Sequence, residues 1–226
     1  MPVNPLAHLS GGNVKLDRRH DRRPLSAAEL RRVLATTETC ERTFRGLTGR
    51  DRHFLYMAAM CSGFRAGELA SLVPEAFALD TDAPMVTLGA AFAKNKRTAT
   101  QPIPHDVTEA LRDYLADKSA GLPVWPGGWA DNAAEMFQAD LEAAGIPYII
   151  DGHDGPLYAD FHALRHSLIA LLDKSGATLK EAMQLARHYD PKLTMAVYGR
   201  AQLHDLAGAI QRLPVLSGPI PGHEAL

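Results

Sequence analysis

The residues best suited to chemistry are spread along the chain and end in a single tyrosine. They are two arginines, a lysine, two histidines and that tyrosine: Arg65, Lys94, His162, Arg165, His188 and Tyr198. Arginine, lysine and histidine can hold a phosphodiester and protonate its leaving oxygen. A tyrosine hydroxyl can attack the phosphorus and form a covalent intermediate. These residue types fit around one phosphate and are hard to explain as packing, so they predict cleavage and rejoining of DNA strands.

His162 and Arg165 lie three residues apart, so on a helix they share one face and can contact one ligand. An imidazole pKa near 6.5 suits proton transfer to or from such a ligand. His166 follows His162 at the spacing of paired zinc ligands, which leaves a metal-dependent hydrolase as an alternative. However, Ala163 replaces the glutamate of the H-E-x-x-H motif, and no third ligand is evident in the sequence.

Arg65 follows a break at Ser62-Gly63 and opens a short segment that carries Glu68 three residues later. Glu68 could pair with Arg65 in the core. It could also orient the Arg65 guanidinium while that group donates two hydrogen bonds to a phosphate, and both possibilities can hold together. Lys94 lies in a polar turn, and a flexible lysine on a turn can reach into a cleft. Taken alone, Tyr198 is typical of a half-buried core tyrosine, because apolar residues precede it.

The elements that must position these residues are mainly helical. Capping boxes at Ser26–Glu29 and Thr178–Glu181 predict two helix starts. Periodicity and glycine or proline breaks predict a helix that begins at Ser26, helices over residues 50–61, 65–72, 106–116, 130–144, 160–174, 178–187 and 202–212, and a helix that begins at Asp190 and carries Tyr198 near its end. Residues 85–88 and 98–103 predict one hairpin around Lys94. We therefore expect a mainly α fold with a small antiparallel β-sheet.

Composition excludes several classes of protein. With 46% hydrophobic and 22% charged residues the chain is typical of a soluble globular protein. It has no membrane-length apolar run and no signal-peptide core, so we expect a cytoplasmic protein. Cys40 and Cys61 form no CxxC pattern, so neither a disulfide framework nor a zinc cluster is indicated. The sequence has no G-x-S-x-G and no phosphate-binding glycine loop, which argues against acyl hydrolases and nucleotide-driven enzymes.

The net charge of −2 hides an uneven distribution. Residues 1–65 carry 12 Lys and Arg against 6 Asp and Glu, whereas residues 66–226 carry 12 against 20. Binding to a phosphate backbone depends on local rather than total charge. The basic first part of the chain is therefore compatible with DNA binding, although a charged stretch can also be only a solvated face.

Together these segments resemble the catalytic domain of tyrosine recombinases, the phage integrase family, over about Leu25 to Leu213. The segment from Ser62 to Leu69 is similar to the family's G-x-R-x-x-E-L motif, and the hairpin ends in Gln101-Pro-Ile-Pro104. By this resemblance the first arginine is Arg65, the lysine is Lys94 with Lys96 as the fallback, the H-x-x-R box is His162 and Arg165, the later histidine is His188, and the nucleophile is Tyr198. The usual Leu-Gly-His is replaced by Leu185-Ala-Arg-His188.

The resemblance implies a site-specific recombinase or integrase that forms a 3′-phosphotyrosyl link without a metal or other cofactor. It implies double-stranded DNA as the partner, tetramers assembled on DNA, and neither a membrane nor a small-molecule substrate; in the cytoplasm the protein would associate with the nucleoid. It also implies that the segment after Tyr198 docks on a neighbour. Residues 202–212 are the candidate for this docking, although from the sequence that helix could equally pack on its own chain. We expect a basic arm or linker over residues 1–24, where the family usually has a DNA-clamping domain, a catalytic domain over 25–213 and a flexible tail over 214–226. The alternatives are a truncated or non-catalytic recombinase-derived DNA-binding protein and a type IB topoisomerase.

Overall fold

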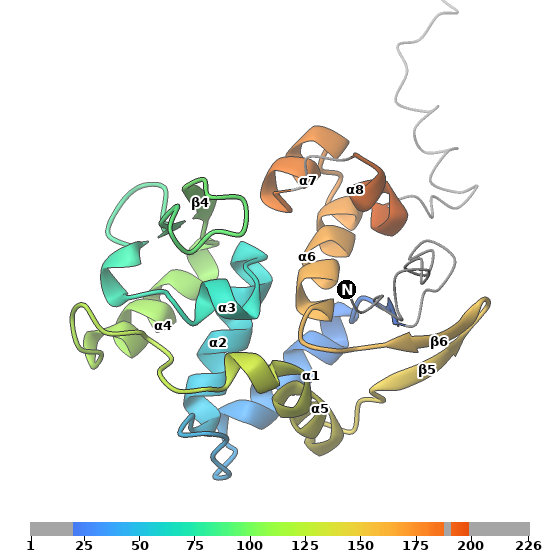
Figure 1. The fold of residues 1–226 in the computed structure, drawn as a ribbon, viewed down its shortest axis with the longest axis horizontal. Coiled ribbons are helices and arrows are strands. Elements are labelled where there is room, and N and C mark those ends of the chain that lie inside the picture. Colours follow the sequence, from blue (N-terminus) through green and yellow to red (C-terminus); the bar gives the residue numbers. More distant parts are fainter. Residues whose placement is uncertain (1–19, 188–190, 199–226) are drawn as a thin grey trace, which may run out of the picture.

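The computed structural model describes residues 20–187 and 191–198. His188, the helix predicted over residues 202–212 and the tail over 214–226 lie outside these residues. The described helices are α1 (Ala27–Glu38), α2 (Gly49–Ser62), α3 (Ala66–Leu69), α4 (His105–Ala116), α5 (Ala133–Ala143), α6 (Ala163–Lys174), α7 (Leu179–Leu185) and α8 (Pro191–Tyr198), with short 3-10 turns at Pro74–Ala76 and Ala130–Asn132 (Figure 1). The mainly helical fold is as the sequence predicts. None of these helices is long and apolar enough to cross a membrane.

Local signals in the sequence account for several helix ends. Both predicted capping boxes form, with Ser26 and Glu29 at the start of α1 and Thr178 and Glu181 at the start of α7. A third, between Thr48 and Asp51, starts α2 and was not predicted. Gly63 ends α2 with φ +63°, a left-handed conformation that glycine adopts without strain. The left-handed backbone of Gly63 thus ends the helix two residues before Arg65.

The predicted hairpin forms within a three-stranded antiparallel sheet. Strands β3 (Met85–Leu88) and β4 (Ala99–Pro102) pair with Val86 opposite Gln101, and β2 (Phe77–Ala78) adds to the free edge of β3. The connection between β3 and β4 carries Lys94 and Lys96. The sequence therefore identified the hairpin but not its third strand.

A second three-stranded sheet corrects two expectations. Strands β5 (Ile149–Gly152) and β6 (Gly155–Tyr158) form a hairpin that projects from the helices (Figure 1), although the sequence predicted only one hairpin. Ile149 and Ile150 are both exposed, so the strand lacks the alternation that marks a half-buried strand. Strand β1 (Asp21–Arg22) pairs in parallel with β6, so the described end of the expected basic arm is an edge strand.

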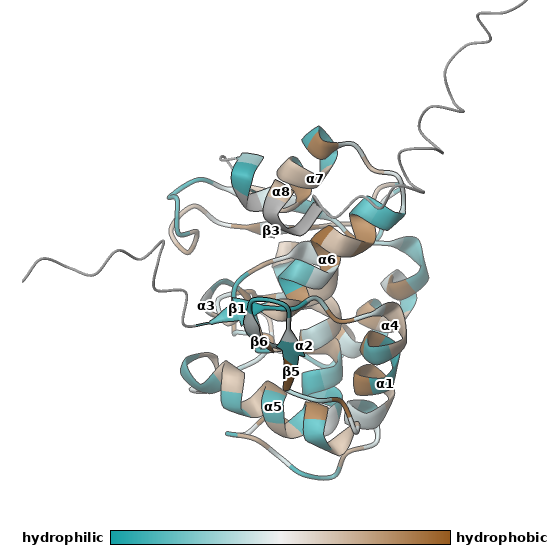
Figure 2. Ribbon diagram, turned by 90° about the vertical axis from the view of Figure 1, so that its right-hand side faces the viewer, coloured by the Kyte–Doolittle hydropathy of each residue, from teal (hydrophilic) through white to brown (hydrophobic). Residues whose placement is uncertain are grey.

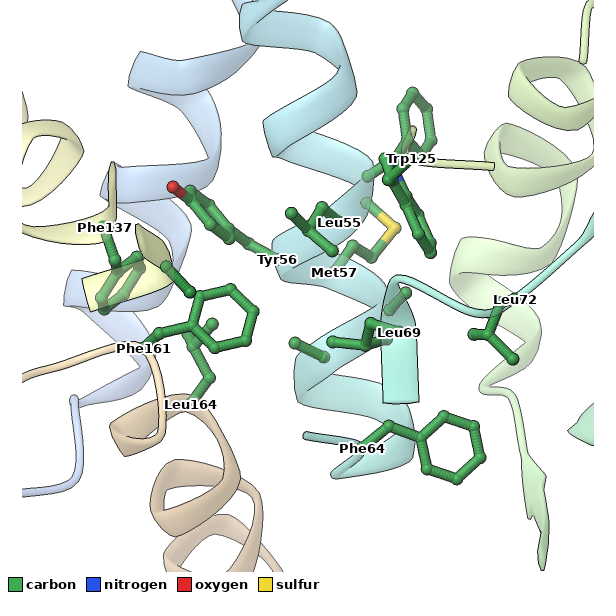
Figure 3. Close-up of a cluster of buried hydrophobic side chains, with 14 of the residues drawn as sticks. Leu55, Tyr56, Met57, Phe64, Leu69, Leu72, Trp125, Phe137, Phe161 and Leu164 are labelled. Atoms are coloured by element: carbon green, nitrogen blue, oxygen red, sulfur yellow. The ribbon is translucent and has the colours of Figure 1, made fainter. Parts of the chain in front are cut away.

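Helix α2 runs through the core, and its side chains contact elements on both sides (Figure 3). Tyr56 points toward Phe137 and Phe161, and Met57 lies near Trp125. The surrounding helices α1, α4 and α5 carry both hydrophilic and hydrophobic residues (Figure 2), as expected for helices that cover a core. Phe161 directly precedes His162, so burial of its ring fixes the start of α6. In the same way, buried Phe64 directly precedes Arg65.

A buried charge network joins α2 to α5. The Arg52 side chain donates from Nε to Asp140 Oδ2 at 2.7 Å, and the Tyr56 hydroxyl donates to the same oxygen at 2.6 Å. The side chains of Arg52 and Asp140 are each 1% exposed. Desolvation and the Asp140 charge raise the pKa of Tyr56, so its hydroxyl stays protonated.

Asp140→Ala should destabilise the fold by about 3–5 kcal/mol, because it leaves the Arg52 guanidinium buried without its counter-charge. Urea unfolding followed by circular dichroism measures this effect. Glu142→Ala, on an exposed position of the same helix, should change the free energy of unfolding by less than about 0.5 kcal/mol. Equal stabilities for the two variants would contradict a stabilising role of this network.

Candidate active site

Arg65 stands at the N-cap of α3, immediately after the turn that ends α2. Its backbone N–H donates to Glu68 Oε2 at 2.9 Å, and its Nη1 donates to Glu68 Oε1 at 3.3 Å. Glu68 is almost fully buried, whereas the Arg65 side chain is 39% exposed. The predicted pairing of Arg65 with Glu68 is therefore present, and it leaves much of the guanidinium open to a ligand.

Arg165 lies in the first turn of α6 and is 2% exposed. Its Nη1 donates to the carbonyl of Gly63, and its Nη2 donates to the carbonyl of Ala186. One guanidinium therefore joins the end of α2 to the end of α7. Its Nε is buried and has no hydrogen-bond partner within the described residues. Desolvation, together with the charges of Arg65 and Arg187, lowers the pKa of Arg165 to about 10, so the group remains charged at neutral pH.

Arg187 is a member of this cluster that the sequence did not single out. It follows α7 and adopts φ +52°, which is uncommon for any residue but glycine. Its Nη2 donates to Glu68 Oε2, and its guanidinium carbon lies 4.7 Å from the centroid of the Phe64 ring. The available signal was the departure from the family's Leu-Gly-His, because Arg187 stands directly before His188 where that pattern has glycine.

The cluster carries more positive than negative charge. Arg65 and Arg187 both pair with the single carboxylate of Glu68, and Arg165 lies close enough to all three for their charges to change its pKa. Three guanidinium groups thus lie near one carboxylate, and two of them pair with it. A partly buried surplus of positive charge favours binding of an anion such as a phosphate.

His162 directly precedes α6 and is half-buried. Desolvation, the neighbouring His166 and nearby arginines lower the pKa of His162 to about 3, and desolvation and Arg22 lower the pKa of His166 to about 4. The expected imidazole pKa near 6.5 is therefore wrong for His162 in the free protein. A neutral imidazole offers one hydrogen-bond donor and one acceptor, so in the free protein His162 can bind a ligand through hydrogen bonds but is a weak base.

The two histidines that could suggest a metal site do approach each other. The ring centroids of His162 and His166 are 5.4 Å apart. Within residues 20–187 and 191–198, however, no three His, Cys, Asp or Glu side chains are placed to hold a metal ion together. The carboxylate whose charge affects the pKa of His166 is Asp160, and both of its oxygens share the single N–H of Arg22 Nε.

Lys94 is exposed in the connection between β3 and β4. This hairpin contacts the end of α7, where Gln101 Nε2 donates to the Leu185 carbonyl at 2.9 Å. A cavity of about 720 Å³ lies between the hairpin and α7, and its lining includes both Asn95 and Arg187. Lys96 is exposed in the same loop, and its Nζ donates to the Ala91 carbonyl at 3.4 Å, so the choice of Lys94 over Lys96 stays a prediction.

Tyr198 is the last residue of α8, the helix that the sequence predicted to carry it. Helix α8 packs on α6, which carries Arg165, and on α7 (Figure 1). The structure thus brings Arg65, His162 and Arg165 together and places the Lys94 loop beside the cavity that Arg187 lines. The roles of Tyr198 and of His188, which lies outside the described chain, remain predictions.

Comparison with known proteins identifies one matching family and several solved structures with a similar fold. The model of the phage integrase family matches residues 23–204. The crystal structure of XerA recombinase aligns with a TM-score of 0.62 and 16% identity over 89% of this chain and 69% of the recombinase. The catalytic domain of bacteriophage HP1 integrase aligns with a TM-score of 0.59 and 18% identity over 86% of this chain and 97% of that domain. XerH site-specific recombinase bound to its difH substrate aligns with a TM-score of 0.63, 16% identity and coverage of 86% and 55%. At these identities the likeness concerns the fold; a search of curated proteins returned no match.

Proposed function

Because this chain belongs to the phage integrase family, we propose that it is a site-specific DNA recombinase that cleaves and rejoins strands through a covalent 3′-phosphotyrosyl intermediate. The observation that carries the proposal is the convergence of Arg65, Arg165 and His162 on a site with surplus positive charge. These are the groups expected around a scissile phosphate, and they come from segments far apart in the sequence.

In the proposed first step, the hydroxyl oxygen of Tyr198 bonds to the scissile phosphorus and the bond from phosphorus to the 5′ oxygen breaks. The tyrosine proton passes to a base; for His162 to take this role the bound phosphate must raise its lowered pKa toward neutrality, as a nearby negative charge does. Lys94 supplies a proton to the departing 5′ oxygen, and His188 assists in positioning the phosphate. Attack by the freed 5′ hydroxyl of a partner strand reverses the chemistry, so the intermediate conserves the bond energy for rejoining.

The two arginines have complementary tasks in this step. Arg165 is held by the carbonyls of Gly63 and Ala186, so its guanidinium is preorganised and places a fixed positive charge beside the non-bridging phosphate oxygens. Arg65 is oriented by Glu68 but remains partly exposed, which suits it to closing on DNA after binding. Neither task requires a metal ion, because guanidinium groups supply the positive charge.

The proposed partner is double-stranded DNA, and no small-molecule substrate takes part. Among the structural neighbours, XerH is bound to its difH substrate, and the Tn1549 transposon integrase is in complex with a circular intermediate DNA. By analogy we expect this protein to assemble as a tetramer on DNA and to act at the nucleoid in the cytoplasm. Supercoiled DNA relaxed without sequence preference would instead indicate a type IB topoisomerase.

The test is covalent capture on nicked DNA. A pool of suicide duplexes of randomised sequence, each nicked so that the cleaved end diffuses away, is incubated with the protein and then denatured with detergent. We expect a protein–DNA adduct that resists denaturation and forms equally well with EDTA present. DNA binding without an adduct would favour the non-catalytic DNA-binding alternative. Loss of activity with EDTA would favour a metal-dependent enzyme.

A further inference from the structure

Arg187 occupies a strained position for which the chain compensates with side-chain contacts. A left-handed backbone at a residue other than glycine costs on the order of 1–3 kcal/mol and persists only where the surroundings hold it. Among the described residues, the Arg187 side chain forms an ion pair with Glu68 and lies over the ring of Phe64. These contacts join the end of α7 to the start of α3, 119 residues apart in the sequence.

Glu68 receives two guanidinium groups, and it holds them unequally. The Arg187 side chain is 11% exposed, whereas the Arg65 side chain is 39% exposed and its Nη1 lies 3.3 Å from Glu68 Oε1. Because Glu68 is itself 4% exposed, its charge must be compensated within the protein. Arg187 shares that compensation with the backbone N–H and the Nη1 of Arg65, so the carboxylate is not paired with the Arg65 guanidinium alone.

We propose that Arg187 is a positioning residue that occupies Glu68 and thereby keeps Arg65 available for the scissile phosphate. The inference rests on the proposed function, since it assumes that Arg65 binds a phosphate. Without Arg187, Glu68 would be a buried carboxylate with Arg65 as its remaining ion-pair partner in the described chain. It would then draw the Arg65 guanidinium into a full pair and away from the DNA.

Two other roles for Arg187 predict different behaviour. If Arg187 bound the phosphate itself, its loss would weaken catalysis whether or not residue 68 carried a charge. If Arg187 only stabilised the fold, its loss would lower the unfolding temperature and leave the cleavage rate of the folded protein unchanged. The cleavage rate of the folded Arg187 variant therefore tests the purely structural role. The dependence of that rate on the charge of residue 68 separates positioning of Arg65 from direct phosphate binding.

The experiment is a double-mutant cycle on single-turnover adduct formation. Arg187→Gly is the first variant, because glycine adopts φ +52° without strain and the backbone should be preserved. We expect it to slow adduct formation by about 10², since Arg65 is then largely removed from the phosphate. In the Glu68→Gln background, where no charge captures Arg65, the same Arg187→Gly change should cost less than about tenfold. Arg187→Lys should stay close to the parent protein, because an ammonium group can also neutralise Glu68.

The matched control uses a different carboxylate. Asp160 is bound by Arg22, and asparagine keeps the same size and an oxygen acceptor for the Ala163 N–H. Asp160→Asn changes the net charge as Glu68→Gln does, so Arg187→Gly should still cost about 10² in that background. An equal cost of Arg187→Gly in the Glu68→Gln background and in the parent protein would overturn the proposal. A reduced cost in both the Glu68→Gln and the Asp160→Asn backgrounds would also overturn it, because net charge alone would then explain the effect.

A second readout separates this inference from the proposed function. Inorganic phosphate is titrated into the folded proteins, and the arginine side-chain N–H signals are followed by NMR. Arg187→Gly should weaken the response of Arg65 to phosphate, and adding Glu68→Gln should restore it. If the parent protein forms no adduct but this pattern is found, the recombinase proposal fails and the role of Arg187 stands. If adducts form and the pattern is absent, the role of Arg187 fails alone.

Discussion

Replacing Tyr198 with phenylalanine should abolish the covalent adduct while the chain stays folded and binds DNA. The change removes the hydroxyl that attacks phosphorus and keeps the aromatic ring, so α8 should be preserved. Loss of a nucleophile leaves no alternative covalent route, and we expect adduct formation to fall by about 10⁴ or more. The measurement is the yield of detergent-resistant adduct on the nicked suicide substrate, with DNA binding assayed in parallel.

Tyr158→Phe is the matched control for this prediction. Tyr158 ends β6, and its ring stacks on His20 with centroids 3.9 Å apart, a contact that phenylalanine can also make. This variant should form the adduct at the rate of the parent protein. Peptide mapping of the parent adduct should then identify the attached residue. An adduct that persists in the Tyr198→Phe variant would show that Tyr198 is not the nucleophile.

Local sequence signals predicted much of this fold, because the interactions that create them are local. The capping boxes at Ser26 and Thr178 act within one helical turn, and Gly63 ends α2 through its own backbone. The hairpin of β5 and β6 was not predicted, because the sequence carries no such local signal for it. Its exposed isoleucines show no alternation, and the pairing of β1 with β6 joins residues more than a hundred positions apart.

The site itself was predicted less completely than the elements that carry it. The family motifs pointed to Arg65, His162 and Arg165, and the structure brings these three together. The role of Arg187 depends on Glu68, which approaches it only in the folded protein, and no pattern of residues encodes the left-handed backbone that directs it there. The lowered pKa of His162 likewise arises from burial and from arginines distant in sequence.

Arg165→Ala should nearly abolish cleavage, and Arg165→Lys should slow it by about 10²–10³ at saturating DNA, because lysine cannot reproduce the fork of a guanidinium. The native side chain donates to the carbonyls of Gly63 and Ala186 through two nitrogen atoms and spreads its positive charge over a planar group. An ammonium group has one donor atom in place of three. The measurement is the single-turnover rate of adduct formation, with thermal unfolding recorded for the same samples.

Thermal unfolding is measured because Arg165 also holds the ends of α2 and α7 together. A less stable fold would itself lower the cleavage rate. Arg23→Lys provides the comparison. Arg23 is also buried, and it donates to a carbonyl, that of Pro147 at 2.8 Å, and to the carboxylate of Glu29. The lysine variant of Arg23 should lose stability in the same way and cleave DNA at the parent rate. If Arg165→Lys and Arg23→Lys lower the unfolding temperature by the same amount and only Arg165→Lys slows cleavage, the slower cleavage results from the loss of the arginine at the phosphate. Equal cleavage rates for both variants would mean that Arg165 serves the fold alone.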